Sequence, residues 1–106
     1  QMCIRDRHCL DLKVQLEKNA IKLIDVREDY EVDICQIQGS INIPMNSIPG
    51  RIHQLNIEQN YAVICHSGVR SHKVCEYLNR QGFSVKNVVG GIDMWATVCD
   101  ESMKRY

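Results

Sequence analysis

The stretch Tyr61-Ala62-Val63-Ile64-Cys65-His66-Ser67-Gly68-Val69-Arg70-Ser71 decides the fold, because it joins an apolar run to a helical pattern through a short loop. We predict a buried strand over Tyr61 to Ile64 and a helix over Ser71 to Gln81. The backbone N–H groups of such a loop turn toward any anion that lies at the start of the helix. Cys65, which opens the loop, is therefore predicted to be a nucleophile rather than a core residue.

The electrostatics of this position can be sized. A free cysteine has a pKa of about 8.5 and is only about 3% thiolate at pH 7. A helix N-terminus supplies about 0.3–1 kcal/mol, occasionally about 2, so the helix alone lowers the pKa by about one unit. We expect the loop amides and the cation of Arg70 to supply the remainder. Gly68 suits this loop, since a residue without a Cβ atom can adopt a positive φ and lets the backbone approach an anion closely.

Helix and strand signals alternate along the rest of the chain, which predicts a layered α/β domain with a mainly parallel sheet. The expected elements besides those named above are helices over 10–18, 29–35 and 48–55 and strands over 23–26, 40–43 and 86–89. Ser71 is expected to cap the helix that follows the loop, and Gly82 to end it. The buried stripe of that helix is predicted to be Val74, Cys75 and Leu78.

The composition describes one small domain. The chain has 106 residues, of which 44% are hydrophobic, enough for a single modest core. Thirteen basic residues balance thirteen acidic ones, so nothing suggests nucleic acid or an anionic membrane as a partner. No apolar run approaches the length of about 18 residues that a membrane span needs, and no secretory signal is visible. We expect a cytoplasmic protein.

The six cysteines raise the alternatives of a disulfide framework or a structural zinc site. Their spacing contains no C-x-x-C pair, and a secretory context is missing, so neither alternative is favoured. Cys35, Cys75 and Cys99 are predicted to be small buried hydrophobic residues. A role for any of them as a resolving thiol stays open.

Four motifs carry a family resemblance. They are Leu23-Ile24-Asp25-Val26-Arg27-Glu28, Gly39-Ser40-Ile41-Asn42-Ile43-Pro44, the loop from Cys65 to Ser71, and Gly90-Gly91-Ile92-Asp93-Met94-Trp95. In this order they resemble the single-domain rhodanese (thiosulfate sulfurtransferase-like) family over roughly residues 10–100. The resemblance implies a rhodanese-like three-layer domain, in which helices flank a central, mainly parallel sheet of four to five strands.

The resemblance also implies roles for individual residues. Cys65 would carry sulfur as a persulfide, and the active-site loop that surrounds it would comprise His66, Ser67, Gly68, Val69, Arg70 and Ser71. His66 would line the mouth of the pocket, where its protonation would tune substrate preference. Asp25 and Arg27 end a strand beside the loop, where bracing of neighbouring loops is favoured over contact with substrate. Trp95 would pack, with one face toward the pocket.

The implied activity is transfer of sulfane sulfur from thiosulfate or a persulfide donor to a thiol or protein acceptor, with no metal or organic cofactor. A non-catalytic or redox-sensing interaction module is the main alternative, because fold alone does not fix function. Phosphatase or arsenate reductase activity is disfavoured. Phosphatases with a related loop place the arginine six positions after the cysteine, whereas Arg70 is five after Cys65, which leaves a smaller ring of amides.

Residues 1–7 are set apart from the rest of the chain. Gln1-Met2-Cys3-Ile4-Arg5-Asp6-Arg7 has no periodicity and resembles a translated sequencing adapter. We expect a single domain over residues 8–106, in which the family's short first strand has been replaced.

Overall fold

The computed structural model describes residues 12–18, 21–37, 39–88, 90–98 and 103. The expectations for residues 1–7 and for Cys99 lie outside this part of the chain. No helix within the described ranges is both long and apolar enough to cross a membrane.

The centre of the domain is a parallel sheet. Its strands are β1 (Lys22–Asp25), β2 (Ile41–Asn42), β3 (Asn60–Ile64) and β4 (Ser84–Asn87), and their order across the sheet is β2-β1-β3-β4. All three pairings are parallel, with Ile24 opposite Ile41 and Val63, and Val63 opposite Asn87. The predicted α/β class and parallel sheet are confirmed, although β4 begins and ends two residues before the predicted range.

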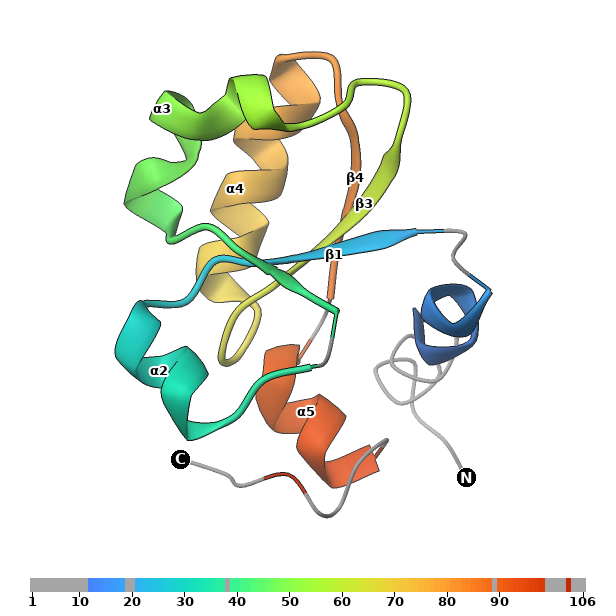
Figure 1. Cartoon of the computed structure of the whole chain (residues 1–106), viewed down its shortest axis with the longest axis vertical. Helices are drawn as coiled ribbons and strands as arrows, with labels where there is room; N and C mark the ends of the chain where they lie inside the picture. Colours follow the sequence, from blue (N-terminus) through green and yellow to red (C-terminus); the bar gives the residue numbers. More distant parts are fainter. Residues whose placement is uncertain (1–11, 19–20, 38, 89, 99–102, 104–106) are drawn as a thin grey trace.

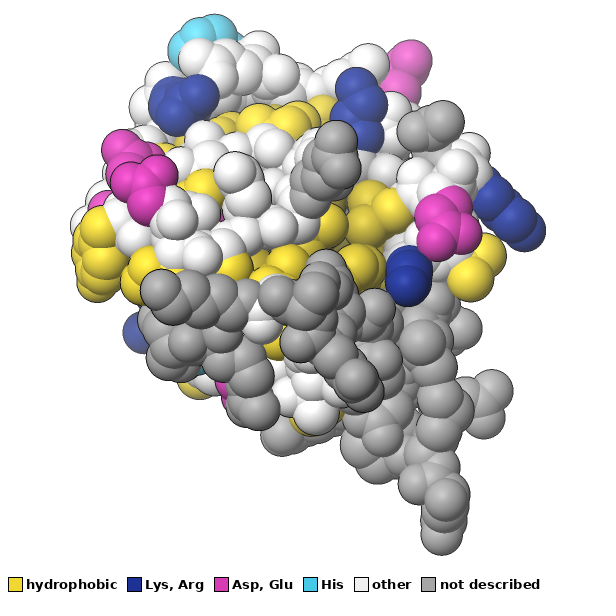
Figure 2. All heavy atoms as spheres, turned by 60° about the horizontal axis from the view of Figure 1, so that its bottom comes forward, with side chains coloured by type: hydrophobic (Ala, Val, Ile, Leu, Met, Phe, Trp, Pro, Cys, Tyr) yellow, Lys and Arg dark blue, Asp and Glu magenta, His cyan; other side chains and the backbone are white. Residues whose placement is uncertain are grey.

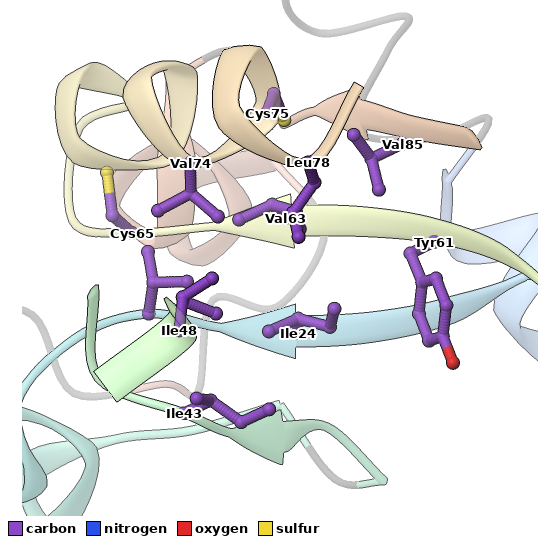
Figure 3. Close-up of a cluster of buried hydrophobic side chains, with 11 residues drawn as sticks. Ile24, Ile43, Ile48, Tyr61, Val63, Cys65, Val74, Cys75, Leu78 and Val85 are labelled. Atoms are coloured by element: carbon purple, nitrogen blue, oxygen red, sulfur yellow. The ribbon is translucent and has the colours of Figure 1, made fainter. Parts of the chain in front are cut away.

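Both faces of the sheet are covered, which gives the predicted three layers (Figure 1). Successive side chains of a strand point to opposite faces. Ile24 and Val63 therefore join one hydrophobic cluster with Val74 and Leu78, which lie on α4 (Val69–Arg80). Their neighbours in the strands point the other way. Figure 3 shows the cluster beneath α4.

The opposite face carries a second cluster. Leu23, Ala62 and Ile64 pack there against Ile92 and Trp95 of α5 (Gly91–Val98) and against Leu12. Leu12 belongs to a helix over residues 12–17, which falls within the predicted range 10–18. No helix was predicted after the Gly90-Gly91 turn, so α5 is an addition to the predicted architecture.

Two helices differ from prediction. The predicted helix over 48–55 is shorter, because α3 covers Ile48–Arg51 and is preceded and followed by 3₁₀ turns at Met45–Ser47 and Ile52–Gln54. The helix after the loop begins at Val69 rather than after Ser71, and Gly68, with φ 104°, is its cap. The prediction that Ser71 caps this helix is wrong, since Ser71 lies inside the first turn. Gly82 follows the helix with φ 94°, as expected for the residue that ends it.

The order of the strands indicates where a ligand would bind. From β1 the chain runs first to β2 on one side and then to β3 on the other, so the topology switches between β1 and β3. In parallel sheets, ligands bind beyond the carboxyl ends of the strands at such a point. Asp25 ends β1 and Cys65 directly follows β3.

Charged side chains do not gather into an area of one sign on the face seen in Figure 2. There, acidic and basic groups of the described residues alternate with hydrophobic ones.

Candidate active site

The loop from Cys65 to Ser71 wraps around the sulfur of Cys65. The Gly68 N–H donates a hydrogen bond of 3.0 Å to Cys65 Sγ, and the Ser71 hydroxyl lies 3.4 Å from the same atom. Figure 3 shows the sulfur directed toward α4 at the end of the cluster. Gly68 has a φ of 104°, which agrees with the positive φ that the sequence allowed at this position.

The loop lowers the pKa of Cys65. Burial raises the pKa of the thiol, because a charge is poorly solvated there. Hydrogen bonds from the Ser71 side chain and from the backbone of Ser71, Gly68 and Ser67 act in the opposite direction and outweigh burial. The pKa therefore lies below the ordinary 9.0. This balance is reasonable, since one hydrogen bond to a charged group contributes about 1.5–3 kcal/mol and one pKa unit corresponds to about 1.4 kcal/mol.

Cys65 is also part of the core. The residue is 1% exposed and belongs to the hydrophobic cluster beneath α4. We predicted that Cys65 is a nucleophile rather than a core residue. In the structure, its sulfur lies near hydrogen-bond donors of the loop, and its side chain also packs among core residues.

Arg70 binds a carboxylate on a neighbouring helix. Its guanidinium binds the carboxylate of Glu31 on α2 (Asp29–Ile34), with Nη1 to Oε1 at 2.7 Å and Nη2 to Oε2 at 2.8 Å. Glu31 is buried, while about a third of the Arg70 side chain is exposed. The arginine thus ties the loop to α2, and the N–H and hydroxyl donors of the loop, rather than this cation, lower the pKa of Cys65.

Asp25 and Arg27 brace the end of β1. Both are buried, and Arg27 Nη2 lies 2.6 Å from Asp25 Oδ2. Arg27 also donates to the carbonyl oxygens of Glu31 and Cys35, at 3.3 and 2.8 Å. This geometry agrees with the predicted bracing role and joins β1, α2 and the segment that follows α2.

The first turn of α5 holds the opposite side of the loop. The N–H groups of Ile92 and Asp93 donate to the carbonyl oxygens of Cys65 and His66, at 2.8 and 3.1 Å. Gly91 precedes them, and a Cβ atom at Gly91 would overlap both carbonyl groups. The Gly-Gly turn is therefore required for α5 to approach the loop.

The remaining predicted residues are spread around this site. Val69 and Ser67 are exposed, whereas His66 is half-buried. Trp95 packs in the second cluster, on the opposite face of the sheet from the cluster that contains Cys65. Cys35, Cys65 and Cys75 are free thiols, and no group of three or more metal-ligating side chains occurs among the described residues.

Sequence reasoning missed Glu31 and Asn87, and it quoted Gly91 within a motif without assigning it a place at the site. Asn87 ends β4, where its Oδ1 accepts from the Ser71 hydroxyl and its Nδ2 donates to the Gly68 carbonyl at 3.2 Å. An acidic residue in a short helix and an amide at the end of a strand carry no signal of their own. Only the packing of the elements brings them to the loop.

Comparison with known proteins identifies the family. A model of the rhodanese-like domain matches residues 9–97. The chain belongs to the rhodanese-like domain family. It is 41% identical over 95 residues to a protein of Bacillus subtilis named "Putative sulfurtransferase YtwF", covering 89% of this chain and 92% of the relative.

Further matches agree with this membership. The thiosulfate sulfurtransferase GlpE of Pseudomonas aeruginosa is 29% identical over 85 residues, which cover 79% of this chain and 77% of GlpE. A rhodanese-like domain protein of Staphylococcus aureus superposes with a TM-score of 0.80 at 35% identity, covering 92% of this chain and 94% of that one. The names of the relatives support a rhodanese-type sulfurtransferase, and the predicted family and fold are confirmed.

Proposed function

We propose that the protein carries sulfane sulfur as a persulfide on Cys65, taking it from thiosulfate or a persulfide donor and passing it to a thiophilic acceptor. The observation that carries the proposal is the set of hydrogen-bond donors around Cys65 Sγ. They lower the pKa of a buried thiol below its ordinary value, and thiolate is the form that attacks sulfur.

The first step loads the enzyme. The thiolate of Cys65 attacks the outer sulfur of thiosulfate, a sulfur–sulfur bond forms on Cys65, and the donor's own sulfur–sulfur bond breaks. Sulfite leaves with the electron pair of the broken bond. The loop amides then face a persulfide whose outer sulfur is anionic, so the backbone N–H groups of the loop stabilise the intermediate as well as the thiolate.

The second step unloads it. A thiolate on a small molecule or protein attacks the outer sulfur, and the electron pair of the breaking bond returns to Cys65 as thiolate. No electrons are gained or lost overall, so these steps need only a donor and an acceptor. His66, half-buried beside Cys65, is proposed to tune the choice of donor.

The burial of Cys65 favours a second candidate, a non-catalytic or redox-sensing module. A residue that is 1% exposed can serve as a core cysteine without ever meeting a donor. A phosphatase is a weaker candidate, because the Arg70 guanidinium is bound by Glu31 with both of its terminal nitrogens.

Intact mass separates these candidates. The protein is incubated with thiosulfate and, in parallel, with a low-molecular-weight persulfide, and its mass is recorded. We expect a gain of one sulfur atom that Cys65→Ser abolishes and that the matched variant Cys75→Ser retains. No gain with either donor would favour the binding module. Hydrolysis of an aryl phosphate that depends on Cys65 would instead support a phosphatase.

A further inference from the structure

We propose that Asn87 is a positioning residue that competes with Cys65 for the hydroxyl proton of Ser71 and thereby restrains ionisation of the thiol. This inference rests on the proposed function, in which the Cys65 thiolate is the attacking group. The contact lies between the end of β4 and the first turn of α4, and neither step of the proposed sulfur transfer uses it.

The orientation of the Asn87 amide is fixed by the loop. Its Nδ2 donates to the Gly68 carbonyl oxygen at 3.2 Å. If the amide were flipped, two acceptor oxygens would face each other at that contact, so the flipped state is disfavoured. Oδ1 must then face the Ser71 hydroxyl, as the structure has it.

Ser71 consequently has two acceptors for one proton. Its hydroxyl lies beside Asn87 Oδ1 and 3.4 Å from Cys65 Sγ, and a hydroxyl donates only one hydrogen bond. While Cys65 is a neutral thiol, S–H donates to Ser71 Oγ and the hydroxyl donates to Asn87, so every group is paired. When Cys65 loses its proton, the hydroxyl must turn to the sulfur, which leaves Asn87 Oδ1 without that donor.

In each cycle of sulfur transfer, the Ser71 hydroxyl proton changes its acceptor twice, between Cys65 Sγ and Asn87 Oδ1. The attacking thiolate needs the hydroxyl of Ser71, but the inner sulfur of a persulfide is uncharged and no longer does. The hydroxyl then returns to Asn87 Oδ1. Asn87 therefore favours the states in which Cys65 is either a neutral thiol or loaded with sulfur, over the free thiolate between them.

The other ionisable groups around the loop have separate partners or a fixed charge state. On α4, Cys75 is neutral at ordinary pH because its pKa is raised to about 12. Arg70 of α4 and Glu31 of α2 bind each other. Asp25 and Arg27 form a pair at the end of β1. His66 lies in the loop, and Asp93 lies on α5, where its N–H donates to the His66 carbonyl. His72 and Lys73 of α4 line a cavity together with Gly68 and Asn87, and His72 pairs with Glu76. None of these residues is altered by a substitution at Asn87.

The test is the pH dependence of alkylation at Cys65, measured by peptide mass in the folded protein with iodoacetamide. We expect Asn87→Leu, which keeps the size of the side chain but removes the competing acceptor, to lower the pH midpoint by about one unit. We expect Asn87→Asp, which strengthens the acceptor, to raise it. Asn79→Ala, an exposed asparagine on α4, is the matched control and should leave the midpoint unchanged.

The deciding comparison is made in a Ser71→Ala background. A shift caused by the Ser71 proton must disappear in Ser71→Ala/Asn87→Leu relative to Ser71→Ala alone. A midpoint that stays or rises in Asn87→Leu, or a shift that persists without Ser71, would overturn the proposal. If circular dichroism shows that Asn87→Leu does not fold, the same comparison is made with Asn87→Asp. A rise in the alkylation midpoint that persists in full in the Ser71→Ala background would then contradict the inference.

Failure of this inference and failure of the proposed function remain distinguishable. Alkylation needs no sulfur donor, so a midpoint that depends on Asn87 in a protein that takes up no sulfur would retain the inference and reject the function. Sulfur uptake with midpoints that do not depend on Asn87 would do the reverse.

Discussion

Cys65 and Cys75 are two buried thiols in the same hydrophobic cluster (Figure 3). Their surroundings nevertheless shift the pKa in opposite directions. Cys75 lies within α4, where burial and the nearby charge of Cys65 raise the pKa to about 12. Burial raises the pKa of Cys65 also, but the loop donors more than reverse it. The hydrogen-bond donors at the end of β3, rather than exposure, therefore set the pKa of Cys65 apart from that of Cys75.

Alkylation at neutral pH should show the largest difference between the two thiols. At pH 7 a thiol with a pKa of 9.0 is about 1% ionised, and one with a pKa near 12 about a thousandfold less. A thiolate with a higher pKa is intrinsically more nucleophilic, which offsets part of this difference in ionisation. Because the pKa of Cys65 is below 9.0, its alkylation should still be at least about tenfold faster than that of Cys75. Peptide mapping by mass measures both rates in one sample, and comparable rates would break the comparison.

Gly91→Ala should disturb Cys65 and leave Cys75 alone. The new Cβ atom would overlap the Cys65 and His66 carbonyl groups, and Gly91 has a φ of 60°. We expect a loss of about 1–3 kcal/mol in the free energy of unfolding and a higher pKa at Cys65. The matched control is Gly50→Ala, since a Cβ atom there meets nothing within 4 Å. Denaturant unfolding measures the loss, and equal effects of the two substitutions would contradict this role of Gly91.

Arg70→Ala tests whether the tether to α2 holds the loop in place. The substitution leaves the buried Glu31 carboxylate without its guanidinium partner, so we expect a loss of about 1–3 kcal/mol in the free energy of unfolding. The fold should remain intact while sulfur uptake slows. Arg80→Ala, in the last turn of the same helix and exposed, should change neither quantity. An unchanged rate of sulfur uptake in Arg70→Ala would show that the Arg70–Glu31 pair is not needed for the reaction of Cys65.

Cys75→Ala should have the smallest effect, and one that depends on pH. Near pH 7 the lost packing is expected to cost about 1 kcal/mol. The folded pKa of Cys75 is above its unfolded value of 9.0, so its contribution to stability is full below pH 9 and is lost as pH rises toward 12. At pH 10 the unfolded thiol of the wild type gains about 1.4 kcal/mol by ionising.

The wild type and Cys75→Ala should therefore be about equally stable at pH 10. Denaturant unfolding at both pH values tests this, with the sulfur-loading assay as a control that should not change. If the difference in unfolding free energy between the wild type and Cys75→Ala stays constant between pH 7 and pH 10, Cys75 ionises normally in the folded state.

Sequence alone predicted the elements whose signals are local. The apolar run before Cys65, the helical stripe of Val74, Cys75 and Leu78, and the glycines at positions 68 and 82 each act within a few residues. The start of α4 was misplaced because Ser71 looks like a cap, whereas Gly68 takes that position and the Ser71 hydroxyl faces Cys65 instead.

The site residues that sequence did not predict act across the chain. Glu31 meets Arg70 over a separation of 39 residues, and Asn87 meets Ser71 over 16. The cation of Arg70 was expected to stabilise the thiolate because only its proximity in sequence was visible. Its buried partner on α2 is set by tertiary packing, which no spacing within one sequence encodes.

The most direct test of the account is a titration of the Cys65 thiolate by its ultraviolet absorbance, taken as the difference between the wild type and Cys65→Ser. We expect a midpoint below that of a free cysteine titrated in the same buffer, because the loop donors outweigh burial. A midpoint at or above the free-cysteine value would mean that burial prevails at both cysteines, and would contradict the claim that the loop prepares Cys65 to carry sulfur.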